Sequence, residues 1–129
     1  MNFKSKNWNL IKAQGLNVRV EYTDSDLHFR FSKKDFFEVP TTVVVIWNEN
    51  CRYVGVAQCG PNDEFSKEKG REIASGRALK MLNEHIIEPD IKADHKLELD
   101  GQIVEVFGNI PQDVQDVISN SILFDGVAK

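Results

Sequence analysis

The stretch from Val54 to Leu82, VGVAQCGPNDEFSKEKGREIASGRALKML, decides how this chain folds. It begins as a strand on which Tyr53, Gly55, Ala57 and Cys59 share one face, and three of these four side chains are small. A helix follows, and at 100° per residue it places a line of small residues at i, i+4 and i+8. This line consists of Gly70, Ala74 and Ala78. Small residues on both surfaces predict that the helix packs very close to the strand.

The ends of this helix are indicated by the residues around it. Gly60 to Asp63 forms a turn, and either Asp63 or Ser66 is suited to cap the first turn of the helix. The apolar stripe then continues to about Ile86.

The residues before this stretch have the patterns of strands. Leu16 to Tyr22 alternates apolar and polar residues, Thr23 to Asp26 has the composition of a turn, and Leu27 to Phe31 alternates again, which together predicts a hairpin. Lys33 to Pro40 is expected to be a connection. Thr41 to Asn48 is a β-branched run without alternation, which indicates a strand covered on both faces.

The two ends of the chain complete the prediction. Residues 1–14 hold enough apolar side chains for a short helix or an arm, and Asp100-Gly101 suits the turn of a hairpin between Lys96 and Phe107. Asn109-Ile110-Pro111 is typical of the start of a short helix. We therefore predict one α+β domain over residues 1–129, in which an N-terminal antiparallel sheet is packed by a central helix and followed by a C-terminal hairpin and short helix.

Composition limits the functions that this domain can have. The net charge is −4, but residues 1–80 carry 13 Lys and Arg against 10 Asp and Glu, whereas residues 81–129 carry 3 against 10. General nucleic-acid binding needs a basic surface and is not expected, while a local anion site in the first part and an acidic surface in the second are compatible with these charges. There is no apolar run of membrane-spanning length and no signal-peptide pattern, so we expect a cytoplasmic protein without membrane contact. Cys51 and Cys59 are expected to be free thiols.

Two arginines of the central helix are the candidates for a binding site. Arg71 projects inside the apolar stripe and Arg77 lies at its rim. In one interpretation both pair with carboxylates of the protein itself and have a structural role. In the other, their guanidinium groups hold phosphate oxygens beside an apolar pocket, with the preceding turn and helix start offering N–H groups. We predict a ligand site formed by Arg71, Arg77, Asp63 and Phe65.

Signatures of catalysis and metal binding are missing from the sequence. No serine, cysteine or threonine has the context of an activated nucleophile, and the three histidines have no ligand spacing. His85 lies near the helix stripe, where a hydrogen-bonded core histidine is the commoner situation. We expect no catalytic residue, no metal and no cofactor.

The residues of the central stretch resemble a known family. The pattern is Gly55-x-Ala57-x-Cys59-x-Pro61-x-Asp63-x-Phe65, followed by Gly70-Arg71-x-Ile73-Ala74-x-Gly76-Arg77-Ala78. Over residues 41–83 it is similar to small proteins of tailed bacteriophages, in particular to the phage Thoeris anti-defence family. That resemblance implies a homo-oligomeric sponge, which sequesters a cyclic ADP-ribose isomer or another cyclic nucleotide signal without cleaving it and so silences a bacterial defence.

Two other classes of function stay open at this stage. The acidic second part favours an anti-CRISPR or anti-restriction inhibitor that contacts a host defence protein. An enzyme acting on a nucleotide has the least support from the sequence.

Overall fold

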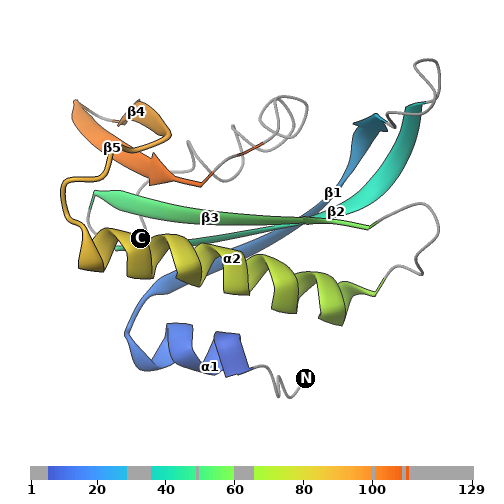
Figure 1. The fold of residues 1–129 in the computed structure, drawn as a ribbon, viewed down its shortest axis with the longest axis horizontal. Coiled ribbons are helices and arrows are strands. Elements are labelled where there is room, and N and C mark those ends of the chain that lie inside the picture. Colours follow the sequence, from blue (N-terminus) through green and yellow to red (C-terminus); the bar gives the residue numbers. More distant parts are fainter. Residues whose placement is uncertain are drawn as a thin grey trace.

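The computed structural model describes residues 6–28, 36–48, 50–59, 66–99, 101–108 and 110. These residues form a five-stranded sheet and two helices, which confirms the predicted α+β class (Figure 1). The elements in chain order are α1 (Lys6–Ala13), β1 (Asn17–His28), β2 (Phe36–Asn48), β3 (Cys51–Gln58), α2 (Lys67–Ile87), β4 (His95–Leu99) and β5 (Gln102–Phe107). The strand order in the sheet is β1-β2-β3-β5-β4, and both helices lie on the same face of it.

Strand β2 is buried on both faces from Thr41 to Ile46, as its sequence predicts. Val43, Val44, Val45 and Ile46 have no exposed surface. Val44 and Ile46 belong to the core under the two helices, whereas Val43 and Val45 pack with Val54, Val106 and Ile110 on the opposite face. A run without polar alternation therefore corresponds to a strand with apolar contacts on each side.

The close packing of α2 on β3 is confirmed at Gly55. A Cβ atom added to Gly55 would overlap the carbonyl oxygen of Ala74 and would lie 2.6 Å from the amide nitrogen of Ala78. A second close approach occurs near the start of the helix, where a Cβ on Gly70 would overlap the hydroxyl of Thr42. Helix and sheet are thus in backbone contact at one point and nearly so at another.

The N-terminal strands differ from the prediction. Thr23 to Asp26 is not a turn: β1 continues through these residues to His28, and each of them pairs with a residue of β2 from Thr41 back to Glu38. The predicted connection from Lys33 likewise ends early, because Phe36 to Pro40 already belongs to β2. A polar run is tolerated here because β1 is the outermost strand of the sheet order, so that one partner strand provides its ladder.

The ends of α2 and the second hairpin agree with the sequence. Ser66 is the N-cap residue, and its hydroxyl accepts a hydrogen bond from the amide of Lys69 at 3.3 Å. Gly101, with φ at +81°, connects β4 to β5. The helix predicted after Asn109 lies outside the described residues, apart from Ile110.

Strand β5 joins the hairpin to the rest of the sheet by a parallel pairing that the sequence did not predict. Cys51 to Tyr53 pair with Glu105 to Phe107. Beside this junction Arg52 is buried, 2% exposed, with its guanidinium carbon 5.9 Å from the ring centroid of Trp47. Burial lowers the pKa of Arg52. No helix among the described residues is long and apolar enough to cross a membrane.

Candidate functional site

Two cationic side chains from the start of α2 meet one tyrosine of β1. Nη1 of Arg71 donates a hydrogen bond to the Tyr22 hydroxyl at 2.7 Å, and Nζ of Lys67 lies 4.9 Å from the centroid of the Tyr22 ring. Lys67 and Arg71 are four residues apart, so one turn of helix presents both to the same side chain. We refer to Tyr22, Lys67 and Arg71 as the cationic cluster.

The close approach at Gly70 explains why these side chains meet. Thr42, which a Cβ on Gly70 would overlap, is the register partner of Tyr22 on the neighbouring strand. The missing side chain at Gly70 therefore lets the helix lie against β2 next to Tyr22. Lys67 and Arg71 flank Gly70 in the chain and are thereby placed within reach of the ring and the hydroxyl.

The positive charges at the start of α2 interact unfavourably with the helix dipole. Lys67, Lys69 and Arg71 lie in the first turns of α2, near the positive end of the helix dipole, where Glu68 is the acidic residue of the first turn. Cations at a helix N-terminus are unfavourable by a few tenths of a kcal/mol each, and an anion there is favourable. An anion at the beginning of α2, from the protein or from outside, would therefore be favourable.

Arg77 lies apart from this cluster. Its Nη1 donates to the backbone carbonyl of Val56 on β3, and its side chain is exposed. Strand β2 separates β1 from β3 in the sheet, so the structure does not bring Arg71 and Arg77 to a common partner. They are six residues apart, so on the helix their side chains point about 120° away from each other around the axis.

The other two residues predicted for the site, Asp63 and Phe65, lie outside the described residues. Of the predicted helix start, the structure describes Ser66 and its capping hydrogen bond. The contact of Arg71 with Tyr22 was not predicted, because the two residues are 49 positions apart and Tyr22 has the place of an ordinary half-buried strand residue.

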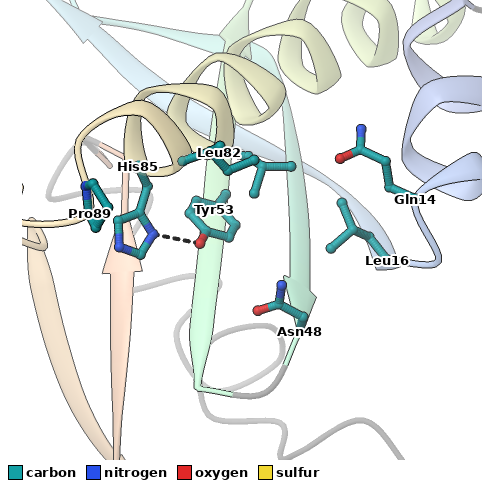
Figure 2. A pocket seen from close by; sticks show the side chains of 8 residues that line it. Gln14, Leu16, Asn48, Tyr53, Leu82, His85 and Pro89 are labelled. Atoms are coloured by element: carbon teal, nitrogen blue, oxygen red, sulfur yellow. Dashed lines mark hydrogen bonds between the residues drawn. The ribbon is translucent and has the colours of Figure 1, made fainter.

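A pocket of about 480 Å³ opens at the other end of α2 (Figure 2). The Tyr53 hydroxyl and Nδ1 of His85 are 2.7 Å apart inside it, and the rings of both residues pack against Phe107 at centroid distances of 5.4 Å and 4.3 Å. His85 is therefore a hydrogen-bonded histidine, as the sequence indicated, although it lies at a pocket wall. Burial, together with the neighbouring Cys51 and Glu105, raises the pKa of Tyr53, so its phenol stays protonated at neutral pH.

Among the described residues, neither the cationic cluster nor the pocket contains a group of metal ligands or a disulfide. Within the described ranges no three His, Cys, Asp or Glu side chains are grouped so as to hold a metal ion. Cys51 and Cys59 are both free cysteines, as expected.

Comparisons with known proteins found no matching family, no matching curated protein and no matching solved structure.

Proposed function

We propose that this protein binds a phosphorylated, nucleotide-derived small molecule and holds it without cleaving it. The observation that carries the proposal is the convergence of Lys67 and Arg71 on Tyr22. A guanidinium, an ammonium and a phenol hydroxyl are three donors suited to phosphate oxygens, and Arg71 can bind them in a bidentate manner.

The class of ligand comes from the sequence resemblance. A sponge of the phage Thoeris anti-defence type needs donors for a pyrophosphate and has no use for a catalytic group. We propose on this basis that the ligand is a cyclic ADP-ribose isomer or a cyclic oligonucleotide, that the protein works in the host cytoplasm as a homo-oligomer, and that it counteracts a bacterial defence.

Thermal shift and calorimetric titration with cyclic ADP-ribose isomers and cyclic dinucleotides test this proposal. A ligand at about 100 times its dissociation constant stabilises the folded state by about 2.7 kcal/mol, which a melting curve resolves readily. Mass spectrometry of the ligand after prolonged incubation must recover it unchanged. Conversion of the ligand would instead establish an enzyme.

Three variants locate the binding site. Arg71→Gln is expected to weaken binding about tenfold to a hundredfold, since hydrogen bonds to charged groups contribute about 1.5–3 kcal/mol. Lys67→Gln should weaken it less, because a solvent-exposed ammonium contributes less than a guanidinium fork. Lys80→Gln is the matched control: Lys80 is an exposed lysine of the same helix, outside the cluster.

Arg77→Gln belongs in the same series. Because Arg77 contacts β3, a loss of affinity in this variant would show that the ligand reaches both flanks of α2. If no ligand stabilises the wild-type protein, or Arg71→Gln binds as well as Lys80→Gln, the cationic cluster is not the site. An inhibitor that contacts a host defence protein would then be the better hypothesis.

A further inference from the structure

We propose that the pocket at the C-terminal end of α2 is a second binding site, specific for an uncharged, planar heteroaromatic molecule with hydrogen-bonding groups, of about the size of a nucleobase or nicotinamide. This site is separate from the cationic cluster and does not depend on the function proposed for it.

The pocket has an apolar interior and a wide mouth. Tyr53 and Leu82 are 3% and 4% exposed and form its floor, while Leu16, Ile86 and Pro89 form its sides. Ile86 is 61% exposed and stands at the rim. A volume of about 480 Å³ lies in the range of roughly 300–1,000 Å³ that small-molecule sites occupy.

The polar groups of the pocket are arranged around this apolar surface. Figure 2 shows the Gln14 side chain at one side of the pocket, the Asn48 side chain below it, and the Tyr53 hydroxyl opposite them. Nε2 of Gln14 donates to the carbonyl of Leu10 at 3.3 Å, which leaves its amide oxygen to accept a hydrogen bond from a ligand. The carboxamide of Asn48 has no hydrogen-bond partner within the part of the chain that the structure describes, so it can both donate and accept.

The charges of the lining decide the class of ligand. The described residues that line the pocket are Gln14, Leu16, Asn48, Tyr53, Leu82, His85, Ile86 and Pro89, and none of these eight is Lys, Arg, Asp or Glu. An ionic ligand would lose its hydration on the apolar floor without gaining an opposite charge, which is unfavourable by several kcal/mol. Carboxamides with a phenol hydroxyl recognise the edge of a neutral heterocycle by paired donors and acceptors.

The polar pair on the floor is held rigidly. Tyr53 and His85 are bound to each other and stacked on Phe107, so their orientation does not depend on a ligand. A pocket formed in advance avoids the entropic cost of ordering side chains on binding.

The two sites are too far apart for one small ligand. His85 follows Arg71 by 14 residues on the same helix, which corresponds to about 21 Å along its axis. If one site fails to bind its ligand, the proposal for the other site is therefore unaffected.

Nicotinamide and nicotinate are the probes for this pocket, because they differ mainly in the charge of one substituent. We would titrate each into ¹⁵N-labelled full-length protein at pH 8 and follow the side-chain amide signals of Gln14 and Asn48. Nicotinamide is expected to shift both signals to saturation. Nicotinate should bind at least about tenfold more weakly.

Two neighbouring isoleucines supply a matched pair of variants. Ile86→Trp places a large side chain at the pocket rim and is expected to abolish the nicotinamide shifts. Ile87→Trp adds the same bulk at a residue that is 78% exposed and does not line the pocket, and it should bind as the wild type does. The proposal is overturned if nicotinamide leaves the two amide signals unchanged, if nicotinate binds equally well, or if Ile86→Trp retains the wild-type affinity.

Discussion

Gly55 on β3 and Ala74 on α2 are in backbone contact: the space where a side chain of residue 55 would begin is filled by the carbonyl oxygen of residue 74. This contact sets the distance between the sheet and the helix. Every residue of α2 that reaches the sheet, Arg71 and His85 included, is placed by it.

Gly55→Ala is therefore expected to destabilise the protein by about 3 kcal/mol, the upper end of the usual cost of overpacking, because the added methyl meets main-chain atoms that cannot rotate away. Gly76→Ala is the matched control. A Cβ there would lie 3.1 Å from the end of the Asn7 side chain, which can move, and alanine favours a helix over glycine by about 1 kcal/mol. Urea denaturation of both variants measures the two free energies of unfolding, and equal stability of the two would contradict the contact.

Replacement of Ser66 by alanine should cost about 1 kcal/mol, since the amide of Lys69 loses the acceptor that caps the helix. Ser66→Asp keeps an acceptor and adds a negative charge at the helix start, so we expect wild-type stability or slightly more. Thermal melts of the three proteins decide this. A loss in the Asp variant equal to that in the Ala variant would show that the hydroxyl has another role.

Tyr53 gives the stability of the protein a dependence on alkaline pH. Because the pKa of Tyr53 is raised in the folded state above the ordinary value of 10.0, the unfolded chain loses this proton first as the pH increases. The contribution of the phenol is complete below pH 10 and decreases above it. Urea midpoints between pH 9 and pH 11 should fall less steeply for Tyr53→Phe than for the wild type.

Tyr22→Phe serves as the control for that experiment, since the chain has two tyrosines and Tyr22 lies in the cationic cluster. Tyr53→Phe also removes the hydrogen-bond partner of Nδ1 of His85, which should cost about 1 kcal/mol at neutral pH. The same pH dependence in wild type and Tyr53→Phe would mean that Tyr53 does not titrate differently on unfolding.

Arg52→Lys is expected to cost about 1–3 kcal/mol, although it conserves the charge. The flat guanidinium that lies over Trp47 is lost, and a buried ammonium is harder to desolvate. Arg19→Lys, at an exposed pair with Glu21 separated by 3.7 Å, should cost less than about 0.5 kcal/mol. Urea unfolding followed by tryptophan fluorescence compares the two, and similar losses would argue against a special environment for Arg52.

The parts of the fold that were predictable from sequence have local patterns. Examples are the small-residue line of α2, the unbroken β-branched run of β2 and the turn at Gly101 between β4 and β5, each of which lies within one element or one hairpin. The path of β1 through Thr23 to Asp26 was predicted wrongly, because its polar composition is typical of turns and its strand pairing depends on residues of β2. The pairing of β3 with β5 has no local signal at all.

The candidate sites, too, were predictable only where they have a local sequence pattern. Arg71 was recognised from its place in the apolar stripe, whereas its contact with Tyr22 arises from the packing of α2 on the sheet. The side chains that line the pocket come from α1, β1, β2, β3 and α2 or the loops beside them. For this reason His85 was the one pocket residue that could be singled out from the sequence. Whether Arg77, Asp63 and Phe65 share in ligand binding stays a prediction.

The three residue pairs between β3 and β5 have a consequence for the order of assembly. These pairs join segments more than 50 positions apart, so the chain must close a long loop before they form, while β1 pairs with β2 and β2 with β3, the strands that follow directly in the chain. We expect β4 and β5 to fold last and to open first. Amide hydrogens in this hairpin should then exchange with solvent faster than those of Val43 to Ile46, as a separate cooperative unit.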